Sequence, residues 1–571
     1  MRTALFGVAA AGAVVTFSSC GTLGLLGVAA IAAWPGDPLL HPKPSRFRVG
    51  GTISGLSGNV VLELNSNESL SLSENGPFLF ERPIDDQAPF EVRILETPSE
   101  QSCSLESALG VVHGRNVNSI QVICAPRTYS IGGIVTDLNG ELELRINDSE
   151  VLSMKASGPF TFQTQLPKGH PYDVTVTTQP RGQACSISGG ASGTVASRID
   201  SITISCRPLF RLGTYQSALQ VIGQRDLSSS SFPSADKVGP DTLDTPWGNP
   251  VAAGGKFYVS DSGSNRILVF NGLPAQNGAS AAFVLGQPDF RSTTTRSGRE
   301  GFSVPEGLSS DGIRLAVADK GNHRVLIYSY LPERQEDRPA IVIGQPDFDT
   351  LPRPACTAST LSVPSDVFVG HGKLIVADTG NGRVLVWNIE SLESGAPADL
   401  VLGQPSATTC TSNTGQSLPS ASTLSRPEGV WTDGKRLLVT DTGNNRVLVW
   451  QNFPTTNGQP ADLVLGQADL LSRNEGTARD KMFAPKAITS TGEQVFVTDY
   501  RNHRVLVWNQ FPTQSGTPAD LVLGQQDFTS QMQLKPPTDR SLNGPTGLLL
   551  ATPNLLVTDS GNSRVLIFES N

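Results

Sequence analysis

A single motif constrains the fold more than any other feature: an Asp followed five positions later by an Arg, with an Asn between them. It recurs six times, with 58 to 63 residues between successive copies. Each Asp follows an apolar segment such as 437–439, and each Arg precedes one such as 447–450. Because this period is long enough for a four-stranded sheet, six copies predict an all-β, six-bladed β-propeller. The pairs are Asp261 and Arg266, Asp319 and Arg324, Asp378 and Arg383, Asp441 and Arg446, Asp499 and Arg504, and Asp559 and Arg564.

A second marker, Val-(Ile/Leu)-Gly-Gln, predicts how the ring closes. It begins 23 residues after the motif Asp in five copies, for example at Val284 after Asp261. The last motif Asp, Asp559, has no such partner before the sequence stops at Asn571, whereas the tetrapeptide at Val221 has no Asp before it. We therefore expect residues 221–224 to form the outer strand of the last blade, which pairs an otherwise exposed edge.

The sequence Asp-Thr-Gly-Asn-x-Arg-Val at Asp378 and Asp441, with variants at the other four copies, resembles the NHL repeat. The resemblance covers about residues 216–571. It implies an NHL-like propeller but no single function, since similar propellers serve as sensor domains, as protein or RNA platforms and occasionally as lyases or hydrolases.

The motif itself has a structural explanation. Its carboxylate and guanidinium can clasp a tight turn between antiparallel strands and bond the backbone of that turn, and Gly and Asn tolerate the positive φ that we expect there. We therefore interpret the twelve residues as structural clasps, with metal or substrate binding as the alternative. The copy that starts at Asp499 lacks the Gly, which predicts a stiffer or differently shaped turn in the fifth blade.

Two tandem copies of one module precede the propeller. Phe47 aligns with Tyr129 and Cys103 with Cys185 at a constant offset of 82 residues. Alternating apolar residues and Gly-rich turns predict small β-sandwiches, Ig-like or transthyretin-like, at residues 47–126 and 127–208, followed by the propeller at residues 209–571. The modules resemble tandem β repeats near the N-terminus of bacterial surface lipoproteins, and we expect them to form a stalk.

The N-terminus predicts export. Residues 1–36 are a leader with a single charge, Arg2, and residues 37–46 form a linker. The segment 17–21 resembles a lipobox, in which Cys20 would be acylated after cleavage. An apolar stretch continues over residues 23–33, so a retained anchor or cleavage after Ala33 are the alternatives. We expect an outer-membrane lipoprotein that faces the periplasm or the cell surface and contacts the membrane through its N-terminus.

The cysteine count agrees with export, because six of seven cysteines remain once Cys20 is set aside. Equal spacing within the modules predicts Cys103–Cys124 and Cys185–Cys206 disulfides. Cys356 and Cys410 lie in neighbouring links between blades, so we expect a third disulfide between them, with two free thiols as the alternative. No Cys or Cys/His cluster suggests structural zinc.

The composition of the chain and the absence of several catalytic motifs from its sequence exclude some classes of function. A net charge of −9 and a pI near 5.3 argue against nucleic-acid binding. No nucleophile elbow, zinc-protease motif or phosphate loop occurs. The lyase of peptide amidation resembles this fold but holds its metal with channel-facing His, and the segments expected in this channel, such as 367–369, contain none. His323 and His503 occupy the same turn position in opposite blades, too far apart to share an ion.

The long links that lead from one blade to the next predict a binding face. Each ends at Pro-x-(Gly/Asp/Ala), so the residues at x should surround the mouth of the channel, although they could instead be solvated loop residues. These residues are Trp247, Glu306, Ser365, Glu428, Lys486 and Thr546.

The sequence thus favours a monomeric, non-catalytic binding or scaffold protein of the cell envelope that needs no cofactor. Its partner would be a protein, a peptide or a glycan on the loop face of the propeller. The alternative is a propeller hydrolase or lyase with a cation such as Ca²⁺ in the channel, held by Glu306 and Glu428.

Overall fold

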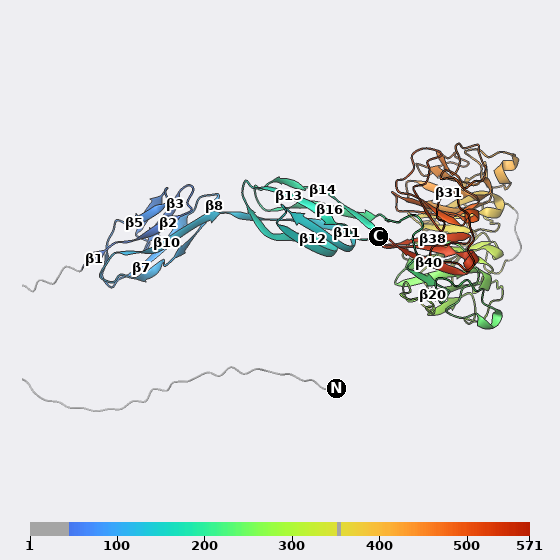
Figure 1. Ribbon diagram of the computed structural model, residues 1–571, viewed down its shortest axis with the longest axis horizontal. Coiled ribbons are helices and arrows are strands. Elements are labelled where there is room, and N and C mark those ends of the chain that lie inside the picture. Colours follow the sequence, from blue (N-terminus) through green and yellow to red (C-terminus); the bar gives the residue numbers. More distant parts are fainter. Residues whose placement is uncertain (1–44, 351–355) are drawn as a thin grey trace, which may run out of the picture. The chain divides into compact units, whose positions relative to one another are not determined.

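The computed structural model describes residues 45–350 and 356–571. The described chain consists of β-strands and short 3-10 turns (Figure 1) and divides into two compact units, the first ending at Arg127 and the second beginning at Thr128. The predicted leader, its Cys20 and nearly all of the linker lie outside the described residues. Within the described residues no helix is long and apolar enough to cross a membrane.

The first unit contains two four-stranded sheets that share one apolar core. Its disulfide, Cys103–Cys124, joins two paired strands at directly opposed positions. The strand order of one sheet is β5 (Gly76–Leu79), β2 (Val49–Ser54), β10 (Val117–Pro126) and β8 (Gln101–Glu106). The order of the other is β4 (Glu68–Leu72), β3 (Val60–Leu64), β7 (Pro89–Glu96) and β9 (Leu109–Val111). A separate pair consists of β1 (Arg46–Phe47) and β6 (Ile84–Asp85).

The second unit begins with strands that repeat this pairing. β10 runs parallel to β2, and β16 runs parallel to β11 with partners shifted by 82 residues, for example Val117 with Val49 and Ile199 with Ile131. A Cβ on Gly51 or on Gly133 would lie 1.9 Å from a carbonyl oxygen of the neighbouring strand, so the close approach requires glycine. The strands are β11 (Thr128–Ile146), β12 (Glu150–Pro167), β13 (Pro171–Thr178), β14 (Gln183–Gly189), β15 (Ser192–Thr194) and β16 (Ile199–Pro208), with a Cys185–Cys206 disulfide between β14 and β16.

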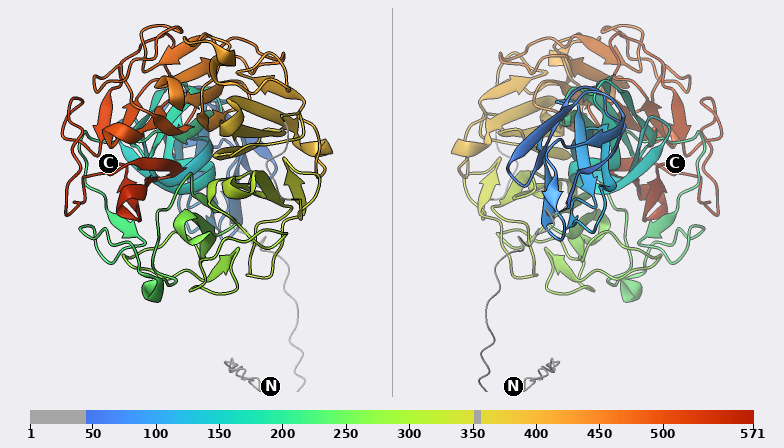
Figure 2. Two further views of the ribbon diagram at one scale, coloured as in Figure 1. Left: turned by 90° about the vertical axis from the view of Figure 1, so that its right-hand side faces the viewer. Right: turned by 90° about the vertical axis from the view of Figure 1, so that its left-hand side faces the viewer.

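The rest of the second unit is a β-propeller. Its described strands form six four-stranded antiparallel sheets arranged around one axis (Figure 2), and the first strands of successive sheets contact one another along a central channel. The sheets, numbered one to six in chain order, begin with β18 (Val251–Ala253), β22 (Pro305–Ser310), β26 (Asp366–Gly370), β30 (Pro427–Thr432), β34 (Pro485–Ser490) and β38 (Pro545–Ala551). Their second strands are β19 (Lys256–Asp261), β23 (Leu315–Asp319), β27 (Lys373–Asp378), β31 (Leu437–Asp441), β35 (Val495–Asp499) and β39 (Asn554–Asp559).

The third strands start at the motif arginines. They are β20 (Arg266–Phe270), β24 (Arg324–Tyr328), β28 (Arg383–Asn388), β32 (Arg446–Trp450), β36 (Arg504–Trp508) and β40 (Arg564–Glu569). The outer strands are β21 (Phe283–Leu285), β25 (Ile341–Ile343), β29 (Leu400–Leu402), β33 (Leu463–Leu465), β37 (Leu521–Leu523) and, in the sixth sheet, β17 (Gln220–Ile222). β17 pairs antiparallel with β40, Val221 opposite Leu566, which confirms that the segment before the first motif supplies the outer strand of the last sheet.

Candidate functional site

The Asp–Arg pairs tie each turn to the long links. In the fourth sheet, Arg446 Nε donates to Asp441 Oδ2 at 2.7 Å, and Asp441 Oδ1 accepts the Ser425 N–H at 2.7 Å. Arg446 Nη2 donates to the carbonyls of Ser420 and Thr423 in the preceding link, and its Nη1 donates to Leu470 in the next one. All six pairs are fully buried. Their arginines therefore bond link carbonyls, and our expectation of bonds to the backbone of the turn was wrong.

The turns have one shape in all six sheets. The residue with positive φ is the one just before the Arg, such as Asn445 (φ 54°) or His503 (φ 53°), and not the Gly of the motif. A Cβ on Gly443 would lie 2.6 Å from the Ser425 carbonyl oxygen, so this Gly serves a close approach. In the fifth sheet Arg501 replaces it, and its N–H reaches the Phe483 carbonyl at 3.1 Å instead of 2.8 Å for Gly443 and Ser425. The longer distance accommodates the Arg501 side chain and the turn keeps the shape of the other five, so the predicted difference in shape was wrong.

The links and the clasped turns lie at the same end of the propeller, which we call the link face. Each link enters the next sheet through a residue with positive φ that precedes a proline. In five of the six links, the backbone N–H of this residue before the proline donates to a side chain of the preceding turn. The acceptor is the turn residue with positive φ: Val304 donates to Asn265, Val363 to His323, Ala484 to Asn445, Gly544 to His503, and Thr245 to Ser563. The links are residues 224–246, 287–305, 345–364, 404–427, 467–485 and 525–545, of which residues 351–355 are not described.

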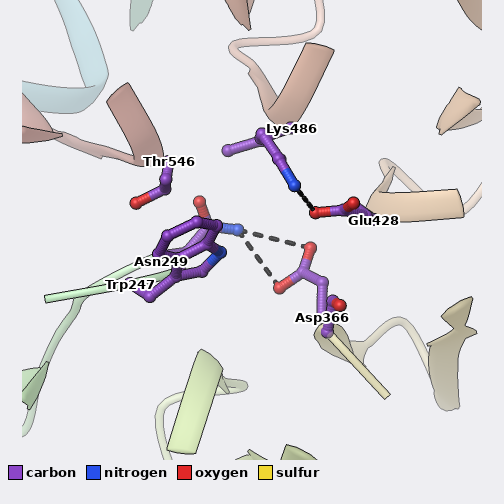
Figure 3. Close-up of a pocket in the computed structure, with 9 residues that line it drawn as sticks. Trp247, Asn249, Asp366, Glu428, Lys486 and Thr546 are labelled. Carbon is purple, nitrogen blue, oxygen red and sulfur yellow. Dashed lines mark hydrogen bonds and ion pairs between the residues drawn. The ribbon is translucent and has the colours of Figure 1, made fainter. Parts of the chain in front are cut away.

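Five of the six residues predicted at the channel mouth line one small cavity (Figure 3). These are Trp247, Ser365, Glu428, Lys486 and Thr546, and the cavity has a volume of about 10 Å³. The sixth, Glu306, is linked to the group through Lys320. All except the half-buried Trp247 are buried, so the alternative that these are solvated loop residues was wrong.

The cavity lies in a layer of buried charges. Lys486 Nζ donates to Glu428 Oε2, and Lys320 Nζ donates to Glu306 Oε1 at 2.6 Å. Asp366 forms no ion pair with any described residue; it accepts the Val430 N–H at 3.0 Å and faces the Asn249 amide at 3.4 Å (Figure 3). The layer thus holds three carboxyl groups and two ammonium groups.

Burial shifts the protonation of this layer. It raises the pKa of Glu306 to about 7 and that of Asp366 to about 7, and it lowers the pKa of Lys486. By comparison, burial raises the pKa of the clasp residue Asp261 to about 6 although Arg266 opposes the shift. Glu306 and Asp366 are therefore carboxyls of this layer whose charge changes near neutral pH.

Two aromatic rings cover the ammonium groups on the link-face side. Lys486 Nζ lies 5.2 Å from the centre of the Trp247 ring and 5.1 Å from that of Tyr500. Lys320 Nζ lies 5.7 Å from the Trp247 ring, and the two rings are 5.7 Å apart. Cation–π attraction stabilises ammonium groups in such positions.

Four residues of this layer were not predicted from the sequence, although each breaks a local pattern: Lys320, Tyr500, Asp366 and Asn249. The residue after the motif Asp is Ser or Thr in four sheets, and there its hydroxyl donates to the proline carbonyl of the next sheet, as Thr442 does to Pro485 at 2.5 Å. Lys320 and Tyr500 occupy this position in the second and fifth sheets. Asp366 replaces the small residue of the Pro-x step, and Asn249 stands where the other five sheets have an apolar residue.

Beyond Asn249 the channel widens toward the opposite face. The cavity there has a volume of about 270 Å³, and its lining mixes polar residues such as Ser309 and Ser490 with apolar ones that include Leu308, Phe368, Trp431 and Leu549. Across residues 45–350 and 356–571, no group of three or more His, Cys, Asp or Glu side chains is arranged to hold a metal ion.

Comparisons with known proteins add little to this geometry. No protein-family model matches the chain, and no curated protein matches it. Virginiamycin B lyase from Staphylococcus aureus is similar in structure at 13% identity and a TM-score of 0.31, over 58% of this chain and 94% of the lyase. A PQQ-bound aldose sugar dehydrogenase from Streptomyces coelicolor is similar at 16% identity and a TM-score of 0.35, over 58% and 96% of the two chains. A nidogen/laminin complex structure is similar at 14% identity and a TM-score of 0.27, over 48% and 82%. Similarity at this level carries no argument about a ligand or a reaction.

Proposed function

We propose that this chain is an exported, monomeric binding protein of the cell envelope that recognises a protein partner with the link face of an NHL-like, six-bladed propeller. In this proposal each four-stranded sheet is one blade, and the two N-terminal modules are β-sandwiches that act as a stalk. Three disulfides support an oxidising location. Acylation of Cys20 would supply the attachment to the membrane.

The observation that carries the proposal is the closed channel mouth. Glu306 and Glu428 each form an ion pair with a lysine, Lys320 and Lys486 respectively, where an enzyme would bind a substrate or a metal ion. A cavity of about 10 Å³ is about the size that one water molecule needs. Organic substrates therefore have no access to these carboxylates, and the surface around the mouth is left as the means of recognition.

The links offer that surface. Five of them expose a large apolar side chain on the link face: Phe232 (57% exposed), Val304 (39%), Leu418 (61%), Leu471 (62%) and Met532 (62%). Apolar and aromatic side chains, Met among them, are typical of protein interfaces, and this favours a protein over a glycan.

The fold also holds this surface in one conformation. The buried arginines bond the carbonyls of the links, and the Cys356–Cys410 disulfide joins two neighbouring links with a Cα separation of 6.3 Å. Loops fixed before binding lose little conformational entropy when the partner docks.

Site-specific photo-crosslinking in cells tests the proposal. A photoreactive phenylalanine that replaces Leu418, Leu471 or Met532, one in each variant, should crosslink to the same partner, so the adducts of the three variants should have the same mass. The same group at Ile313 (59% exposed) or Tyr330 (79% exposed), which lie on the opposite face, is the matched control. Adducts confined to the control positions, or different proteins at each link position, would contradict recognition by the link face.

One observation favours the alternative, a hydrolase or lyase with a cation in the channel. Glu306 Oε2 and Ser365 Oγ are each buried without a hydrogen-bond partner among the described residues, and a cation could satisfy such an atom. Calorimetric titration of wild type and Glu306→Gln with Ca²⁺ tests this second candidate. Tight binding that the substitution abolishes would support the enzyme, and the absence of heat would leave the binding protein.

A further inference from the structure

In five links a side chain of the preceding turn accepts the N–H at the end of the link; we call these side chains link anchors, and two of the five are histidines. His503 Nδ1 accepts the N–H of Gly544 at 2.9 Å, and His323 Nδ1 accepts the N–H of Val363 at 3.0 Å. In the first and fourth sheets, Asn265 and Asn445 make the same bond through an amide oxygen. In the sixth sheet the hydroxyl of Ser563 takes this role. The same bond is thus made by imidazole, amide and hydroxyl groups, of which only the imidazole titrates near neutral pH.

His503 holds its link at two points. Besides the bond to Gly544 at the end of the link, its Nε2 lies 2.7 Å from the side-chain amide of Gln533. Gln533 is the neighbour of Met532, one of the exposed apolar side chains of the link face. The half-buried imidazole therefore connects the exposed part of the link at residues 525–545 to its entry into the sixth sheet.

The bond to Gly544 requires a neutral ring. Because Nδ1 accepts this N–H, the proton of the neutral imidazole is on Nε2, which donates to the side-chain amide of Gln533 through the oxygen of that amide. A second proton on Nδ1 would face the Gly544 N–H and turn an attraction into a repulsion. Burial lowers the pKa of His503, so the anchor is present above the ordinary histidine pKa and is lost as the pH falls through the lowered value.

Charged residues near the ring do not change the direction in which the pKa of His503 is shifted. The fifth turn carries Arg501 and the mutually paired Asp499 and Arg504, and the link packed on the ring carries Asp527, Lys535, Asp539 and Arg540. Burial is the cause of the lowered pKa of His503, without an added contribution from these charges.

We propose that His503 is an acid-sensitive latch of the link face, which holds residues 525–545 when its ring is neutral and releases them when the ring is protonated. Loosening of the link follows directly from the loss of the hydrogen bond between the Gly544 N–H and His503 Nδ1. Release of a bound partner at acid pH also rests on the function proposed above.

Hydrogen exchange of the Gly544 amide tests the latch in the full-length protein. Overlapping peptides across residues 540–548 give its protection factor, corrected for intrinsic exchange, from about pH 7.5 down to about pH 4.5, a range that spans histidine titration. The amide of Ala484, held by Asn445, is the internal control. His503→Asn is the matched variant, because Asn tolerates positive φ and supplies an acceptor that does not titrate.

We expect the wild-type Gly544 amide to lose about tenfold in protection across this range, the size of one lost hydrogen bond, while the Ala484 amide keeps its protection. In His503→Asn both amides should keep their protection. Constant protection at Gly544 in the wild type, or an equal loss at Gly544 and Ala484, would overturn the latch.

Partner binding distinguishes the two proposals. If the captured partner binds the link face but its affinity does not fall with pH in step with the exchange at Gly544, the latch exists without controlling binding. If the protection of the Gly544 amide falls with pH as predicted but no partner is captured, only the proposed function is wrong.

Discussion

The ammonium group of Lys486 donates a hydrogen bond to the carboxylate of Glu428 across two neighbouring sheets, and both residues are more than nine-tenths buried. The indole of Trp247 covers this pair from the link face. A buried ion pair leaves a costly unpaired charge when one partner is removed, although the intact pair adds little net stability.

Lys486→Met should therefore destabilise the propeller by about 3 kcal/mol, because the Glu428 carboxylate keeps only its long contact to the exposed Arg426 at 3.4 Å. The double variant Lys486→Met/Glu428→Gln should recover at least half of that loss. Urea unfolding monitored by tryptophan fluorescence measures both, with the exposed Lys435→Met as control. Equal stabilities of the single and double variants would show that the buried charge is not the cause.

The clasps predict a second stability effect. Arg446→Lys should cost about 3–5 kcal/mol, because a lysine cannot reach Asp441 and the carbonyls of two links together. Arg473→Ala, at an exposed position of the link at residues 467–485, should cost less than about 0.5 kcal/mol. A shift of the melting temperature no larger than that of the control would contradict the structural role of the pair.

The channel carboxyls predict a dependence on pH. A carboxyl whose pKa is raised on folding contributes stability at acid pH that is lost as the pH rises through about 7, as for Asp366. From pH 5 to pH 8 the wild type should thus lose about 2 kcal/mol of unfolding free energy relative to Asp366→Asn. Unfolding in urea at several pH values measures this, with the exposed Asp349→Asn as control. Parallel stability curves for wild type and Asp366→Asn would be the contrary result.

Ring closure predicts the effect of removing β17. Deletion of residues 216–226 leaves β40 with an unpaired edge, so we expect a lower melting temperature and aggregation visible by light scattering. An unchanged melting curve and a monomeric elution profile would contradict closure by this strand.

Much of the propeller could be predicted because its information is local and repeated. The Asp–Arg spacing predicted where the turns lie, and the orphan tetrapeptide at Val221 predicted β17. The Pro-x step predicted which residues gather at the mouth, since each follows the same turn into the first strand of a sheet.

The rest of the site depends on contacts across the ring, which spacing along one sheet does not encode. Trp247 from the first sheet meets Lys320 from the second and Tyr500 from the fifth, and no repeat offset links these three positions. From the sequence His323 and His503 were set aside as ion ligands, since they lie in opposite blades, and their position as anchors became clear only from the N–H groups of the following link.

Binding of the captured partner to two matched variants tests the central claim most directly. Leu471→Asp introduces a charge on the link face, and Tyr330→Asp introduces one on the opposite face, at side chains that are 62% and 79% exposed. We predict that Leu471→Asp weakens binding by at least about tenfold, as expected for an interface residue, while Tyr330→Asp leaves the affinity unchanged. An unchanged affinity for Leu471→Asp together with a loss for Tyr330→Asp would contradict recognition by the link face.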